Sequence, residues 1–151
     1  MFDPQVILHP TDYSECARHA FELAVDIAHQ HGSRLIVLHV ADTLGPEHIS
    51  YGEAISQRQP ASQQQLLLAE LHRVQPPPLS PVRLDHILKE GDPATVIADV
   101  AAREHCDLIV MGTYGRSLLT RLLTGSVTQR VSHLAACPVL TVRVPGRRTE
   151  D

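Results

Sequence analysis

The sequence predicts a single α/β domain in which a parallel sheet is covered by helices on both faces. Short apolar runs, too short to form surface helices, alternate along the chain with longer segments whose apolar residues recur at helical spacing. This alternation is typical of parallel sheets, because a helix must cross over before the next parallel strand begins. The 151 residues suit one compact domain, expected to span 1–151 with a flexible tail at 144–151.

The first part of the chain predicts a complete strand–helix–strand unit. A strand is expected at 6–8, and Ser14 can then cap a helix over 15–31. Gly32 can end that helix in the left-handed conformation. The continuous apolar run 35–40 suits a strand that is buried on both faces.

The remaining elements follow from the same patterns, after an irregular segment expected at 41–62. Asp92 is placed to cap one of the helices, with Pro93 at its first position. The alternating run 82–88 suits a strand nearer the sheet edge. We expect further helices at 63–74, 93–104 and 126–135, and further strands at 82–88, 107–111 and 138–144.

Composition and charge exclude several classes of partner. The chain has 13 basic and 17 acidic side chains, a net charge of −4, and no run of five or six like charges. We therefore expect no nucleic-acid partner and no membrane association. The longest apolar runs are far below the roughly 18 residues of a membrane span. The first residues lack the pattern of a signal peptide, so a cytoplasmic location is expected. Cys16, Cys106 and Cys137 are read as small buried hydrophobic residues.

A glycine-rich loop after the fourth expected strand carries the main chemical signal. The loop is bounded by two clusters, Met111-Gly112-Thr113-Tyr114-Gly115-Arg116 and Gly125-Ser126-Val127. Glycines let backbone N–H groups turn toward an anion, Ser126 can cap the following helix, and Arg116 adds a positive charge. A phosphate group is the natural ligand for such a loop. A tight turn without a ligand is the alternative.

Two other phosphate-binding loops are excluded by inspection. The only lysine, Lys89, is followed by Glu90, so the chain contains no GxxxxGK[ST] loop. No two glycines stand at positions i and i+2, so the GxGxxG dinucleotide fingerprint is also absent. The loop therefore belongs to neither of these classes.

The spacing of the glycines matches the pattern of a known family. The pattern G-x2-G-x9-G-[ST] is matched by Gly112, Gly115, Gly125 and Ser126. Segments 7–14, 35–40 and 137–143 look like the first strand and turn, the second strand and the end of the same domain. On these residues the chain resembles the universal stress protein family.

The resemblance implies an open five-stranded parallel sheet of the adenine nucleotide alpha hydrolase-like type. It implies that ATP, with Mg, binds where the strand order reverses, and that a homodimer forms through 138–144. Thr11 and Asp12 would lie beside the adenosine, and the main chain of Val40 against the base. The residues implied around the ribose and phosphates are Gly112, Gly115, Arg116, Gly125, Ser126 and Val127. Pro10 and Met111, beside these residues, complete the expected site.

Three points qualify these expectations from the residues themselves. The Asp12 carboxylate can accept hydrogen bonds from ribose hydroxyls or an exocyclic amine, or it can simply form a turn before Ser14. Tyr114 stands where many family members have histidine, which changes what touches the phosphates. His9 and His39 lie near strand ends, but a third metal ligand is missing, so no metal site is expected there.

Two classes of function remain open from the sequence. The first is a dimeric ATP-binding stress-response or regulatory protein with at most slow hydrolysis, because the loop has one arginine and no evident general base. The second is a nucleotide-free dimeric adaptor of the same fold that binds an unidentified protein. The intact glycine spacing favours the first class.

Overall fold

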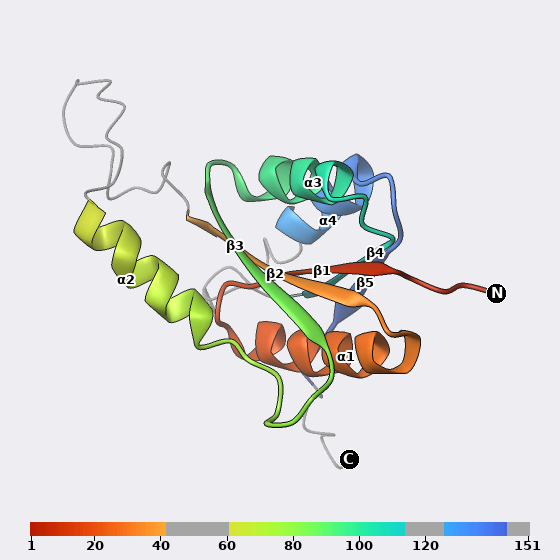
Figure 1. Ribbon diagram of the computed structural model, residues 1–151. Coiled ribbons are helices and arrows are strands. Elements are labelled where there is room, and N and C mark those ends of the chain that lie inside the picture. Colours follow the sequence, from red (N-terminus) through yellow and green to blue (C-terminus); the bar gives the residue numbers. More distant parts are fainter. Residues whose placement is uncertain (42–60, 114–125, 145–151) are drawn as a thin grey trace, which may run out of the picture.

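The protein is a five-stranded parallel sheet between two helical layers (Figure 1). The computed structural model describes residues 1–41, 61–113 and 126–144. The strands follow the order β3-β2-β1-β4-β5 across the sheet. They are β1 (Val6–Pro10), β2 (Arg34–Ala41), β3 (Arg83–Glu90), β4 (Leu108–Gly112) and β5 (Val139–Val142). The predicted fold class is confirmed.

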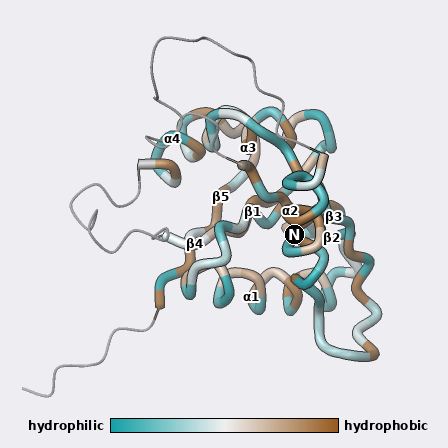
Figure 2. Tube along the Cα trace, turned by 90° about the vertical axis from the view of Figure 1, so that its left-hand side faces the viewer, coloured by the Kyte–Doolittle hydropathy of each residue, from teal (hydrophilic) through white to brown (hydrophobic). Residues whose placement is uncertain are grey.

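Helices cover both faces of this sheet. They are α1 (Glu15–His31), α2 (Ala61–His72), α3 (Pro93–Arg103) and α4 (Ser126–Leu134). Figure 2 shows α1 on one side of the strands and α3 with α4 on the other. No helix within the described ranges is long and apolar enough to cross a membrane.

The helix ends confirm the predicted caps. Helix α1 begins and ends at the predicted residues, and the Ala17 N–H donates to Ser14 Oγ over 3.2 Å. Gly32 ends this helix in the left-handed conformation, with φ of 65°. Asp92 caps α3 by accepting from the Thr95 N–H, with Pro93 in the first turn.

The sheet divides the core into two clusters, one under each helical layer. On the α1 side, Ile7, Leu35 and Val110 pack against alanines of the helix. On the other side, Leu8 and Ile109 pack against residues of α3 and α4. Adjacent residues of one strand thus face opposite layers, as expected for a sheet buried on both faces.

Two predicted spans need correction. The helix expected at 63–74 spans Ala61–His72, so it begins and ends two residues earlier. It lies beside the edge strand β3, and of its residues only Leu71 is buried, whereas Leu66 is 72% exposed. The last strand is also shorter than the predicted 138–144, because only Val139–Val142 pairs with β4.

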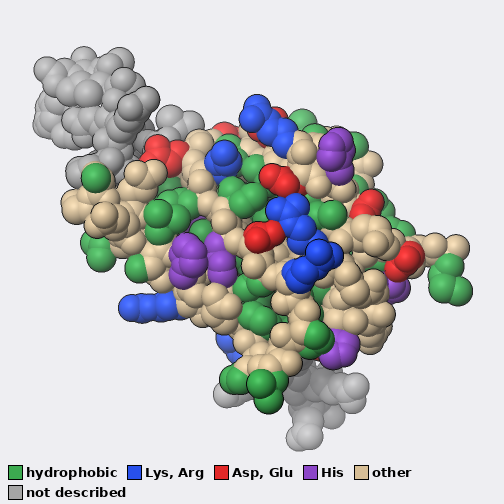
Figure 3. Space-filling model, in the orientation of Figure 1, with side chains coloured by type: hydrophobic (Ala, Val, Ile, Leu, Met, Phe, Trp, Pro, Cys, Tyr) green, Lys and Arg blue, Asp and Glu red, His purple; other side chains and the backbone are tan. Residues whose placement is uncertain are grey.

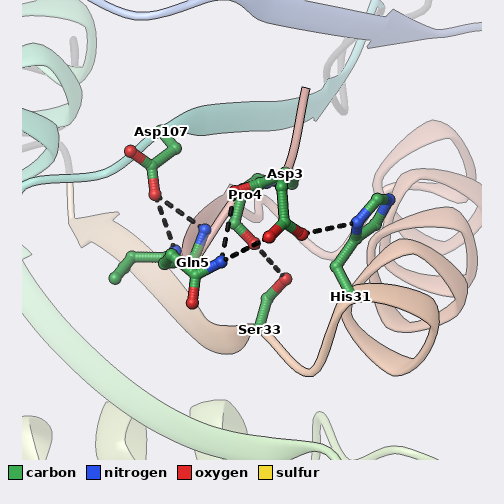
Figure 4. Close-up of polar contacts among 7 residues, drawn as sticks. Asp3, Pro4, Gln5, His31, Ser33 and Asp107 are labelled. Carbon is green, nitrogen blue, oxygen red and sulfur yellow. Dashed lines mark hydrogen bonds and ion pairs between the residues drawn. The ribbon is translucent and has the colours of Figure 1, made fainter. Parts of the chain in front are cut away.

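The amino-terminal end of the sheet is closed by a polar network (Figure 4). The backbone N–H groups of Gln5 and Val6 both donate to Asp107 Oδ2, over 2.8 and 3.0 Å. Ser33 Oγ donates to the Pro4 carbonyl over 2.6 Å. These bonds hold the start of β1 between β2 and β4. This end of the sheet is therefore occupied by structural contacts. Functional residues are expected at the opposite end, where the strands have their carboxyl termini.

Charges of both signs are mixed on the surface. In Figure 3, basic and acidic side chains lie next to one another on the face in view. Arg34 illustrates this arrangement, since it forms ion pairs with Asp85 at 2.6 Å and Glu104 at 3.2 Å. On this face, neighbouring charges of opposite sign partly cancel one another.

Candidate functional site

The strand order reverses between β1 and β4, and the candidate site lies at the carboxyl ends of these two strands. From β1 the chain turns into α1 on one face, whereas β4 is followed by α4 on the other face (Figure 1). Ligands of open α/β sheets bind at such a reversal point. The predicted residues Pro10, Thr11, Asp12, Met111 and Gly112 all lie here.

The other predicted residues are distributed around the same end. Val40 lies near the end of β2, the neighbour of β1, and Ser126 and Val127 begin α4. Gly115, Arg116 and Gly125 lie outside the described residues.

The turn after β1 is held by hydrogen bonds of its own side chains. Tyr13 N–H donates to Thr11 Oγ1 over 3.1 Å, and Ser14 N–H donates to Asp12 Oδ1 over 3.0 Å. Tyr13 has a φ of 63°, a conformation that bulky residues rarely adopt. The turn therefore has a defined shape before any ligand arrives.

The structure shows one of the two roles considered for Asp12 from the sequence, that of forming the turn. One carboxylate oxygen accepts the Ser14 amide and so shapes the turn. The side chain is nevertheless only half-buried. A carboxylate oxygen has more than one lone pair, so Asp12 retains capacity to accept from a ligand hydroxyl or amine.

The end of β2 projects past its partner. The paired residues of β1 and β2 end at Pro10 and Leu38, whereas β2 continues to Ala41. Val40 therefore pairs only with β3, through Lys89, in this register. The Val40 side chain packs against the core below α3. On the side of β1, the Val40 backbone therefore lies beyond the last paired residues of the two strands.

Gly112 is required by packing as well as by its place in the loop. A Cβ atom built on Gly112 would lie 2.8 Å from the Cys16 carbonyl carbon and 2.9 Å from the Ala17 nitrogen. These are backbone atoms of the first turn of α1, which cannot give way easily. The close approach brings the end of β4 against the amino terminus of α1.

Helix termini and hydroxyls surround the same point. Thr128 Oγ1, in the first turn of α4, donates to the Gly112 carbonyl over 3.3 Å. Helix α4 therefore starts beside the end of β4, and the amino terminus of a helix can attract an anion. Met111 is buried in the core and Val127 packs against the same cluster, so both side chains are occupied by core contacts.

One contact near this site, the pairing of Asp92 with Arg130, has no signal in the sequence. Arg130 on α4 donates from both terminal nitrogens to the two Asp92 oxygens, each over 2.9 Å. These bonds and those from Thr95 hold the pKa of the Asp92 carboxyl well below its usual range. The pairing connects α4 to the capping residue of α3. No local pattern could reveal it, because the partners lie far apart in the sequence.

His9 is held inside the sheet as a neutral side chain. It is 1% exposed, and its Nδ1 donates to the Val110 carbonyl over 2.9 Å. Burial lowers the pKa of His9 to about 4. In the described part of the chain, no three His, Cys, Asp or Glu side chains are grouped as ligands for a metal.

The cysteines agree only in part with the expected packing role. Cys16 and Cys106 are buried, whereas Cys137 is only partly buried. Burial raises the pKa of the Cys106 thiol to about 12, which keeps it protonated at neutral pH. Cys106 is thus a small core residue, as expected.

Comparison with known proteins identifies the family. The model of the Universal stress protein family matches residues 4–143. The chain belongs to this family. A universal stress protein from Thermus aquaticus, encoded in the QAH/OAS sulfhydrylase 3′ region, is 38% identical over 143 residues, which cover 92% of this chain and 98% of that protein.

Solved structures of universal stress proteins share the fold. UspA from Lactobacillus plantarum has a TM-score of 0.71 at 28% identity, with 92% of this chain and 97% of that one covered. A universal stress protein in complex with cAMP has a TM-score of 0.64 at 22% identity, covering 93% and 98% of the two chains. One from Archaeoglobus fulgidus in complex with dAMP has a TM-score of 0.59 at 18% identity, covering 94% and 99%.

Proposed function

We propose that this universal stress protein binds an adenine nucleotide, with ATP and Mg as the physiological ligand, and acts as a dimeric stress-response or regulatory protein. The observation that carries the proposal is the meeting of three features at one end of the sheet. These features are the Asp12 carboxylate, the projecting backbone of β2 and the amino terminus of α4. Relatives of the same fold in complex with cAMP and dAMP support an adenine nucleotide as the ligand.

The residues at this end fit the two halves of a nucleotide. Asp12 would accept hydrogen bonds from the ribose or the exocyclic amine, and the Val40 backbone would contact the base. The amino terminus of α4, with Gly115, Arg116 and Gly125, would receive the phosphates. Bound Mg²⁺ would neutralise part of the phosphate charge. Without an evident general base, binding rather than rapid hydrolysis is the proposed activity.

The first prediction concerns the Asp12 carboxylate. Asp12→Asn should weaken ATP binding about tenfold, because a neutral acceptor replaces a charged one. The asparagine oxygen can still accept the Ser14 amide, so the turn should survive. Isothermal titration of nucleotide-free protein, with and without Mg²⁺, measures the effect. Asp26→Asn, at an exposed position of α1, is the matched control and should bind like the parent.

A second variant tests the glycine loop. Gly115→Val should abolish binding, since its side chain would block the approach of the backbone to phosphate. Circular dichroism must show that each variant is folded. If the folded parent does not bind ATP, the proposal is wrong and the nucleotide-free adaptor becomes the preferred function. A search for a protein partner would follow.

The proposed dimer rests on the exposed edge of β5. This strand is at one edge of the sheet, and Leu140 on it is 37% exposed. Unpaired edges of this kind tend to pair with another chain. In this register Leu140 pairs with β4, so the backbone N–H groups that face the outer edge belong to Val139 and Thr141. Thr141→Pro, which removes an edge donor, should convert the dimer to a monomer, as measured by sedimentation. Thr141→Val, which leaves the backbone able to pair, should weaken the dimer less. A parent that sediments as a monomer, or a folded Thr141→Pro dimer, would refute this interface.

A further inference from the structure

His39 connects β2 to the turn that follows β1. Its Nδ1 lies 2.8 Å from the carbonyl oxygen of Thr11. Because a carbonyl oxygen can only accept, Nδ1 is the donor and carries the proton. The His39 ring also packs against the ring of Tyr13, with centroids 4.8 Å apart and planes tilted by 39°. His39 therefore contacts the residues on both sides of Asp12.

These contacts restrict a turn that would otherwise be strained. The left-handed conformation of Tyr13 is unfavourable for an aromatic residue and persists only where its surroundings enforce it. Besides the His39 bond, the Thr11 N–H donates to the Leu38 carbonyl over 2.8 Å. Two successive residues of β2 thus hold Thr11. The position of Asp12 follows from that attachment.

We propose that His39 is a positioning residue of the nucleotide site, which sets the affinity for the nucleoside half of the ligand by fixing the turn that presents Asp12. This inference rests on the proposed nucleotide binding. His39 lies on β2 and acts through Asp12 on the nucleoside half. The phosphates would be received at α4, which follows β4, and β1 lies between β2 and β4 in the sheet. Neither the sequence pattern nor the loop glycines pointed to this residue.

Two substitutions separate the hydrogen bond from the bulk of the side chain. His39→Leu removes the donor and keeps an apolar side chain against Tyr13. His39→Asn places an amide nitrogen close to the position of Nδ1 and so retains a donor to Thr11. His86→Leu is the matched control, because the half-buried His86 on β3 also donates to a backbone carbonyl, that of Val74, over 2.7 Å.

ATP titration of these variants gives the decisive comparison. We expect His39→Leu to weaken binding about tenfold, His39→Asn to stay within about threefold of the parent, and His86→Leu to bind like the parent. In an Asp12→Asn background, His39→Leu should cause little further loss, because two residues that act through one contact are not additive. A purely structural role of His39 would give the same additional loss in both backgrounds.

A second measurement examines the turn without nucleotide. Amide hydrogen exchange at Tyr13 and Ser14 should be faster in His39→Leu than in the parent and the control. Unchanged exchange, unchanged ATP binding or an additive loss with Asp12→Asn would each overturn the role of His39 while leaving nucleotide binding intact. A parent that does not bind ATP would instead refute the proposed function, and this inference with it.

Discussion

Gly112→Ala should destabilise the protein by about 2–4 kcal/mol, because the added Cβ would overlap backbone atoms. That Cβ would lie 2.8 Å from both the Cys16 carbonyl carbon and the Cys16 Cβ. To relieve the overlap, either α1 must move away from the sheet or β4 must bend. Both movements would open the core around Val110. Urea denaturation of the parent and the variant measures the loss.

Gly32→Ala is the matched control for this prediction. Gly32 has a φ of 65°, but a Cβ on it would meet no atom within 4 Å. Its substitution should therefore cost only the strain of the left-handed conformation, about 1 kcal/mol. An equal cost at both glycines would show that close packing against α1 is not the reason for glycine at Gly112.

The stability of the protein should fall by about 2 kcal/mol between pH 7 and pH 5 because of His9 alone. Burial lowers the pKa of His9 to about 4 in the folded state, against 6.5 for a solvated histidine. Between these values the unfolded chain binds a proton that the folded chain does not. Falling pH therefore favours unfolding, and the effect is absent above the unfolded pKa.

Denaturation of His9→Asn across this pH range tests whether His9 causes the loss of stability. The asparagine amide can still donate to the Val110 carbonyl, but it does not titrate. The variant loses packing at every pH, yet its stability should fall about 2 kcal/mol less than that of the parent between pH 7 and pH 5. Gln30→Asn, at an exposed position of α1 with no titratable group, should retain the parental slope. Parallel curves for the parent and His9→Asn would contradict a neutral buried His9.

Most of the fold was predictable because its signals are local. The span of α1 follows from the serine before it, the glycine after it and the apolar spacing between them. The same reasoning identified Asp92 as a cap and β3 as an edge strand. The exposure of Leu66 on α2 was not predictable in this way, because helical spacing shows which residues share a face and not whether another element covers that face.

The candidate site was predictable only as a set of residues. Glycine spacing, together with a resemblance to the universal stress proteins, indicated the loop after β4 and the turn that contains Asp12. Sequence reasoning interpreted Gly112 as part of a ligand-binding loop or of a tight turn. The structure adds a packing reason, since the end of β4 meets the first turn of α1. His39 was considered only as a metal ligand, whereas its hydrogen bond to Thr11 makes it part of the site's framework.

By itself the sequence determined the order of elements, the helix caps and the family, because periodicity, capping and motif spacing involve residues near one another in the chain. Only the tertiary structure decided that His9 is neutral, that Gly112 admits no side chain, and that Arg130 pairs with Asp92. Each of these properties depends on atoms contributed by a distant segment. Burial and close approach arise when the sheet brings such segments together, and no local pattern encodes the distances that result.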